Sequence, residues 1–177
     1  MIELFFNEFL STFPFHILAC VPFHKKLRHS PWKTFLWVCG FELGYLLLFL
    51  FLIQIGLSSV WVQYLALPCF GVLFKLIVDA ESGMILFLYL FIIDYLLVVR
   101  AAAFCICQAL FGYNFFSWET GLVTFLLVLC SIYFMAKAMT RTVEGLSSVS
   151  IPSFWNTAWL LPGSVTLILL LLTGNIR

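Results

Sequence analysis

Charged residues are scarce in this sequence. Only 10% of its 177 residues are Asp, Glu, Lys or Arg, whereas 64% are hydrophobic, and the mean hydropathy is +1.13. Soluble domains usually carry about 25% charged and about 45–50% apolar residues. The composition therefore excludes an ordinary soluble domain and predicts a protein whose main partner is the lipid bilayer. A net charge of +1 also argues against nucleic acid as a partner, because such binding needs a clear positive excess.

Motifs of known catalytic and metal-binding chemistry are absent as well. The sequence contains no GxSxG, no HExxH, no glycine-rich phosphate loop and no paired acidic motif. Its six cysteines fall in apolar runs and lack the CxxC or Cys/His spacing of a zinc site. We therefore expect no catalytic residue, no metal and no cofactor, and we interpret the cysteines as small buried hydrophobic residues.

What the sequence does contain is long apolar runs, and a run of about 20 residues suffices for a transmembrane helix. Six such runs can be drawn, at residues 3–23, 34–55, 61–78, 84–110, 119–139 and 154–173, with Pro14 breaking the first. Helix is the required conformation, because open strands would leave backbone groups unpaired in lipid. The prediction is an all-α polytopic membrane bundle of six transmembrane helices, forming a single domain over residues 1–177. Residues 140–153 are predicted to be a polar linker.

Positive charge gathers on one side of this predicted bundle. The loop at residues 21–33 holds four of the nine Lys and Arg residues, and three more flank the other loops of that side; the seven are Lys25, Lys26, Arg28, Lys33, Lys75, Lys137 and Arg141. Because such residues resist translocation, we expect this side to be cytoplasmic and the N-terminus to be outside. The expected location is a bacterial cell membrane, crossed several times. The basic loop could also recognise anionic lipid headgroups, although topology control explains it adequately.

Four ionisable residues lie inside the apolar runs, where each costs several kcal/mol and is a candidate for function: His16, Glu42, Asp94 and Arg100. At about 1.5 Å per residue, His16 and Glu42 both lie roughly 11–12 Å from the basic side, so they could pair across the first hairpin. Asp94 and Arg100 are six residues apart and face different directions, so each is expected to find a partner on another helix. A packing role and a sensing or binding role both remain open.

The opposite side of the predicted bundle has only short loops without Lys or Arg. An outward-facing pocket, if present, would be lined by Arg100 and by Trp61, Gln63, Gln108, Phe115, Phe116 and Trp118. A surface of this size suits a small peptide, a lipophilic compound or the bilayer itself better than a large protein.

Three short motifs resemble a known family. They are CVPFHKKLRHSPWKTFLW at residues 20–37, FKLIVD at residues 74–79, and the pattern carried by Trp155, Trp159, Leu160 and Pro162. Together they resemble the membrane sensor domain of GHKL-type sensor histidine kinases from Gram-positive, mostly clostridial, bacteria. The resemblance implies a receptor module of a two-component system, a homodimer if it is part of a kinase.

Kinases of this family carry a dimerisation helix and a GHKL-type ATPase domain after the membrane part, and no such region follows Thr173. The expectation is therefore a truncated sensor that is not itself an enzyme. Two alternatives stay open. One is a small six-helix transport protein, such as the substrate-binding subunit of a vitamin transporter, with a polar cavity formed by Asp94, Arg100, Gln108 and Gln63. The other is an inert membrane remnant.

Overall fold

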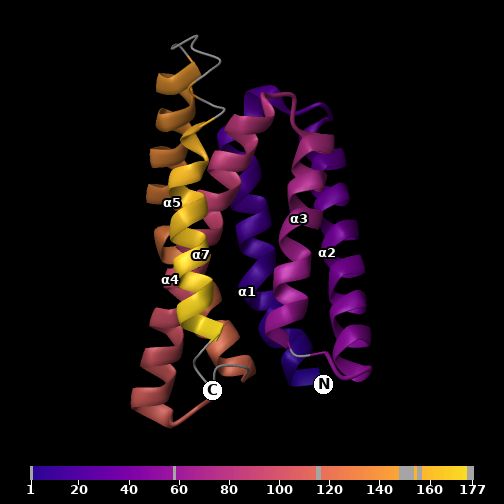
Figure 1. Cartoon of the computed structure of the whole chain (residues 1–177), viewed down its shortest axis with the longest axis vertical. Coiled ribbons are helices and arrows are strands. Elements are labelled where there is room, and N and C mark those ends of the chain that lie inside the picture. The colour runs from indigo at the N-terminus through magenta and orange to yellow at the C-terminus, as the bar shows by residue number, and fades with distance from the viewer. Residues whose placement is uncertain (1, 58, 115–116, 148–153, 155–156, 175–177) are drawn as a thin grey trace.

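Helices make up most of the described chain in the computed structural model (Figure 1). The structure describes residues 2–57, 59–114, 117–147, 154 and 157–174, but not the side chains of residues 59–61, 63–67, 146–147 and 170–174. Within these residues the only β-pairing is one isolated bridge, so the predicted all-α fold is confirmed. The helices whose bounds lie in the described residues are α1 (Ile2–Cys20), the 3-10 helix η1 (Val21–Lys26), α2 (Pro31–Gln54), α3 (Ser59–Ile77), α4 (Ser82–Phe111), α5 (Trp118–Ser147) and α7 (Leu160–Gly174).

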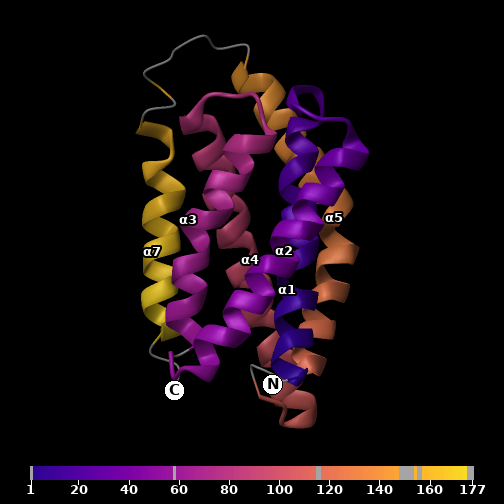
Figure 2. The same cartoon turned by 90° about the vertical axis from the view of Figure 1, so that its right-hand side faces the viewer.

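Helix α1 lies in the middle of the bundle. It packs against α2, α4 and α5, while α3 packs against α2 and α4, and α7 packs against α4 (Figures 1 and 2). This central position buries polar as well as apolar side chains of α1, which include Asn7, Glu8, Ser11, Thr12 and His16. Among the described side chains, the helix at the centre of the fold therefore has the most polar buried face.

Four of the helical segments in the described chain are long and apolar enough to cross a membrane, judged by length and composition: Ile2–Lys26, Pro31–Gln54, Ser82–Phe111 and Trp118–Gly145. The apolar stretches Pro68–Ile77 of α3 and Leu160–Leu169 of α7 are shorter. Large apolar side chains such as Leu47, Phe51 and Phe134 also cover the outside of the bundle, each more than half exposed. Such an exterior is expected of a membrane-embedded protein. Six complete spans remain a prediction.

Several helix boundaries differ from those predicted. Helix α1 continues through Pro14 and ends at Cys20, where the chain turns into η1 with Pro22 in its first turn. Residues 21–23 therefore belong to η1 and do not extend α1 as predicted. Helix α7 begins at Leu160 rather than at residue 154.

The predicted linker at residues 140–153 is wrong for its first eight residues, because α5 runs on to Ser147. Met139 and Val143, four residues apart, are both buried and carry the packing face of α5 beyond the apolar run. Polar residues between them face away from that contact and are tolerated there, because water can solvate them outside the lipid.

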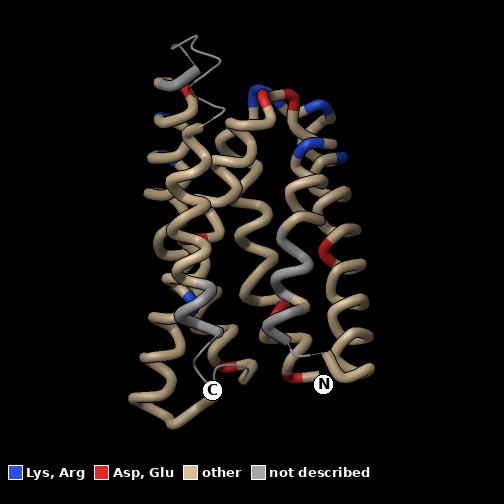
Figure 3. Tube along the Cα trace, in the orientation of Figure 1, with Lys and Arg blue, Asp and Glu red and all other residues tan. Residues whose placement is uncertain are grey.

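Apart from Arg100, the described Lys and Arg residues gather at one end of the bundle, which we call the basic end (Figure 3). This end holds η1, the turn between α3 and α4, and the last turns of α5. An antiparallel bridge joins Leu27 to Val78, with Arg28 N–H donating to Ile77 O at 2.9 Å and Asp79 N–H donating to Lys26 O at 2.8 Å. The loop after α1 is thus fastened to the turn before α4.

Candidate functional site

A polar stripe runs along the buried face of α1. Glu8, Thr12 and His16 follow each other at intervals of four residues, so they lie one above the next on the same face of the helix. All three are at least 93% buried, and Asn7 beside Glu8 is 99% buried. Each of these groups must find its partner on a neighbouring helix, because no water reaches it in the bilayer interior.

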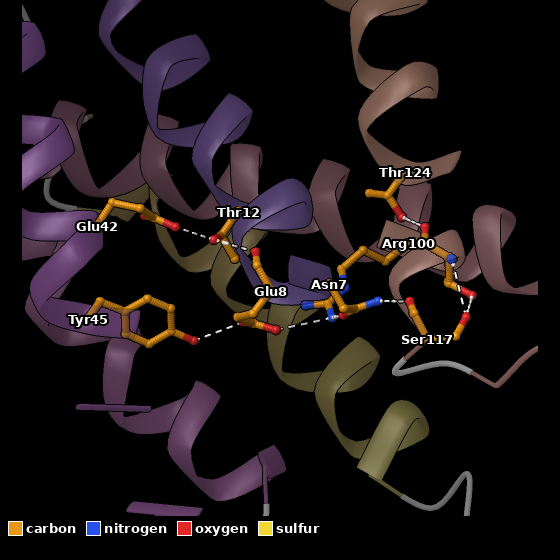
Figure 4. A network of polar contacts seen from close by, with 9 residues as sticks. Asn7, Glu8, Thr12, Glu42, Tyr45, Arg100, Ser117 and Thr124 are labelled. Carbon is orange, nitrogen blue, oxygen red and sulfur yellow. Dashed lines mark hydrogen bonds and ion pairs between the residues drawn. The ribbon is translucent and has the colours of Figure 1, made fainter. Parts of the chain in front are cut away.

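Glu8 lies at the centre of the first cluster, and both of its carboxylate oxygens are occupied (Figure 4). Tyr45 of α2 donates its hydroxyl to Glu8 Oε1 at 2.8 Å. Arg100 of α4 approaches Glu8 Oε2 with Nη2 at 3.3 Å, and the same nitrogen donates to Asn7 Oδ1 at 3.2 Å. One carboxylate therefore joins α1, α2 and α4.

Glu42 lies at the centre of the second cluster, nearer the basic end. Its Oε2 lies 2.8 Å from His16 Nδ1, which is ion-pair distance although the alignment is not that of a hydrogen bond. Its Oε1 accepts a hydrogen bond from the Thr12 hydroxyl. The His16 ring also stacks on Phe70 of α3, with ring centroids 3.7 Å apart. The histidine is thus held between α2 and α3.

Thr12 connects the two clusters. Its hydroxyl also lies 2.8 Å from the backbone carbonyl of Glu8. A hydroxyl has one proton to donate, so at any moment Thr12 donates either to Glu42 or to its own helix. The proton of Thr12 therefore has two acceptors, and only one of them ties α1 to α2.

A close approach of α1 to α5 extends the first cluster to a further helix. Asn7 donates its amide to the carbonyl of Ser117, the residue before α5, at 2.6 Å. At Gly121 a Cβ atom would lie 2.8 Å from Asn7 Cα, a distance that real Cβ atoms essentially never show. Glycine at this position is therefore what allows α1 and α5 to approach at the level of Asn7.

The four predicted intramembrane residues divide into three locations. His16 and Glu42 lie together, as the depth count indicates, and Arg100 belongs to the neighbouring cluster around Glu8. Asp94 lies apart from them and accepts a hydrogen bond from Thr166 of α7 at 2.5 Å. Asp94 and Arg100 thus each have a partner on another helix, as their spacing predicts.

The predicted outer pocket is mostly outside the described residues, namely Phe115, Phe116 and the side chains of Trp61 and Gln63. Gln108 is exposed on α4. Trp118 lines an open groove of about 460 Å³ together with Ile2, Glu3, Phe6 and Leu10. Arg100 is 94% buried, and its guanidinium contacts Glu8 of α1.

The predicted basic loop is held by exposed ion pairs. Lys25 Nζ lies 2.9 Å from Glu144 Oε1 at the end of α5, and Arg28 Nη2 lies 3.4 Å from Asp79 Oδ1. Lys25, Lys26 and Arg28 line an open hollow of about 630 Å³ with Leu27 and Asp79. Lys33 lies apart from it, in the first turn of α2.

Sequence reasoning missed Asn7, Glu8, Thr12 and Tyr45. Glu8 is only six residues into α1, close enough to the expected membrane surface to be discounted as an end residue. The polar spacing of Glu8, Thr12 and His16 is the signal that could have found the stripe, because three polar residues at intervals of four define one helix face.

The arrangement is suited to joining helices, because the carboxylates of Glu8 and Glu42 each contact side chains from at least one other helix. Among the described residues, no group of three or more His, Cys, Asp or Glu side chains could hold a metal ion. Comparison with protein-family models, curated proteins and solved structures gave no match. The candidate function therefore rests on the geometry of the two clusters and on the sequence motifs described above.

Proposed function

We propose that this chain is an integral-membrane signal-receiving module, of the kind that the motif resemblance implies for receptor histidine kinases. The observation that carries the proposal is the buried carboxylate of Glu8, which is bound by Tyr45 of α2 and Arg100 of α4. This contact joins three helices in the apolar interior. How the three helices pack against each other therefore depends on the charges of Glu8 and Arg100.

The physical basis is the cost of leaving a charge unpaired. Removing one partner of a buried ion pair costs about 3–5 kcal/mol, because the remaining charge has no water around it. Helix packings in which Glu8 and Arg100 stay in contact therefore have a much lower free energy than packings in which the two separate. The bundle is then expected to adopt a few discrete packings rather than a continuous range of them. A signal acts on such a system by binding one packing more tightly than the other.

The transport alternative requires a different use of the same residues. It predicts a polar cavity to which Asp94 and Arg100 both contribute. These two side chains instead bind Thr166 of α7 and Glu8 of α1, respectively. Because both side chains are engaged by neighbouring helices, the arrangement favours a packing device over a solute-binding cavity.

In the proposed arrangement the basic end faces the cytoplasm and the N-terminus lies outside, in a bacterial cell membrane. The stimulus is a small peptide, a lipophilic compound or a change in the bilayer. The receptor functions as a homodimer, and a histidine kinase region of the same receptor reads the packing of the bundle at the basic end.

The test measures distances across the basic end by pulsed electron paramagnetic resonance. Spin labels replace Lys75 of α3 and Arg141 of α5, both exposed, in a full-length chain without its native cysteines and reconstituted in bilayers. We expect Glu8→Gln to add a second discrete distance while the helix content stays constant. The matched control is Glu3→Gln, the same change at an exposed position of the same helix, which should leave a single distance.

Tyr45→Phe removes only one hydroxyl from the cluster. This milder variant replaces Glu8→Gln in the experiment if Glu8→Gln fails to fold. Tyr45→Phe should also populate the second distance between the spin labels, but to a smaller extent than Glu8→Gln. A single unchanged distance in a folded Glu8→Gln or Tyr45→Phe variant would contradict the proposal, since the cluster would then not control the packing at the basic end.

A further inference from the structure

An open groove lies on the outer face of α2, near the basic end. It is lined by Lys33, Leu36, Trp37, Gly40 and Phe41, all from this one helix, and has a volume of about 450 Å³. Helix α2 lies at the edge of the bundle (Figure 1), so the groove faces the surrounding lipid. We propose that this groove binds an anionic phospholipid, with its phosphate at Lys33 and one acyl chain passing over Gly40.

The charge at the mouth of the groove selects an anion. Lys33 is the only ionisable residue among the five that line it. Within the described part of the chain Lys33 makes no ion pair, whereas Lys25 and Arg28 of the neighbouring loop already face Glu144 and Asp79. Helix α2 begins at Pro31, so the positive end of its dipole lies at the same level.

The depth of the groove matches the length of a lipid. Gly40 follows Lys33 by seven residues, which places it about 10 Å deeper along the helix. The groove therefore runs from the headgroup level, where Lys33 lies, into the region of the acyl chains. Trp37 lies between them and is 53% exposed, and the His29 ring stacks on it with centroids 6.5 Å apart. An indole at this level is typical of the membrane interface.

Gly40 creates the space for the chain. A Cβ atom at this position would meet nothing within 4 Å, so no other part of the described protein fills the hollow. A larger residue can therefore be introduced without a clash. Gly145 of α5 is equally open and lies outside this groove, which gives a matched control.

A second copy of the chain is the other occupant that this face could accept, since Gly40 and Gly44 have the spacing of a small-xxx-small helix contact. Parallel packing of two copies would bring both Lys33 ammonium groups to the same depth, where like charges repel. An anionic phospholipid instead supplies the opposite charge. This charge complementarity favours a lipid over a second copy of the chain as the occupant of the groove.

The test uses the fluorescence of Trp37, measured as the difference between the wild-type chain and Trp37→Phe. The full-length protein is reconstituted in phosphatidylcholine bilayers that contain brominated phosphatidylglycerol or, at the same mole fraction, brominated phosphatidylcholine. We expect the anionic lipid to be enriched at Trp37 by about five-fold, the effect of one basic residue near anionic lipid. Lys33→Gln should abolish this preference, and Gly40→Leu should reduce quenching by both lipids.

Gly145→Leu should leave the quenching as in wild type, and circular dichroism checks that each variant keeps its helix content. Equal quenching by the two lipids would overturn the proposal, as would a preference that survives Lys33→Gln. Weak quenching of Trp37 by both lipids in the wild-type protein would mean that lipid does not reach the groove, and would assign this face of α2 to contact with a second copy instead. Loss of the preference on adding inorganic phosphate would assign Lys33 to free phosphate rather than to lipid.

Discussion

Two regions of the bundle use ion pairs in opposite surroundings. In the interior, Glu8 and Arg100 are 3.3 Å apart, with side chains 1% and 7% exposed. At the basic end, Lys25 and Glu144 are closer, at 2.9 Å, but are 72% and 52% exposed. Water and salt screen the exposed pair, whereas a buried charge that loses its partner has no water to replace it. The surroundings, and not the distance, decide which pair holds the fold together.

The largest expected effect comes from removing one buried charge. Arg100→Gln leaves the Glu8 carboxylate in the bundle interior without its cation, and we expect a loss of about 3–5 kcal/mol in the free energy of unfolding. Reversible unfolding in mixed detergent micelles measures it. Arg141→Gln is the same change at an exposed position and should have little effect. Equal losses in the two variants would remove the distinction between the regions.

The close contact of α1 with α5 gives the next largest effect. Gly121→Ala places a Cβ atom 2.8 Å from Asn7 Cα, so the helices must separate, at an expected cost of about 1–3 kcal/mol. Gly145→Ala in the same helix meets nothing within 4 Å and should not destabilise the protein. The same unfolding experiment compares them. An unchanged stability of Gly121→Ala would show that α1 and α5 do not approach as described.

The hydroxyl of Thr12 allows a finer comparison of buried and exposed contacts. Thr12→Val removes the donor to Glu42, and we expect a loss of about 1–2 kcal/mol in the free energy of unfolding. Thr142 makes the same hydrogen bond to the carbonyl four residues before it, but it is exposed and has no buried carboxylate beside it. Subtracting the stability loss of Thr142→Val from that of Thr12→Val leaves the part that is due to the hydrogen bond between Thr12 and Glu42. A difference of zero would mean that Thr12 donates only to its own helix.

The smallest effect is expected at the basic end. Glu144→Gln removes the acid that faces Lys25, and the thermal midpoint should not change measurably, at low or at high salt. If this variant were destabilised as much as Arg100→Gln, the exposed pairs would carry the fold and the comparison would be reversed.

The sequence predicted the helices well, because apolar runs of this length in a chain with so little charge leave few alternatives. It also predicted the level at which His16 meets Glu42, since depth follows from a residue count along two adjacent helices. The extension of α5 to Ser147 was missed, because the polar residues after residue 139 hide the buried pair Met139 and Val143.

The partner of Arg100 could not be predicted in the same way. Hydropathy specifies which segments cross the lipid but not which helix occupies the centre, and many arrangements of six helices satisfy the same pattern. Once α1 is central, Glu8 and Asn7 face Arg100 and the glycine at residue 121 acquires its role. These contacts are properties of the packing and not of any one segment.

The most direct test of the central claim is a double-mutant cycle between Glu8 and Arg100. The free energy of unfolding is measured for wild type, Glu8→Gln, Arg100→Gln and the double variant in the same micelles. If the pair holds α1 against α4, the double variant should be more stable than the sum of the single losses predicts, by at least about 2 kcal/mol. Additive losses, within about 0.5 kcal/mol, would contradict the account.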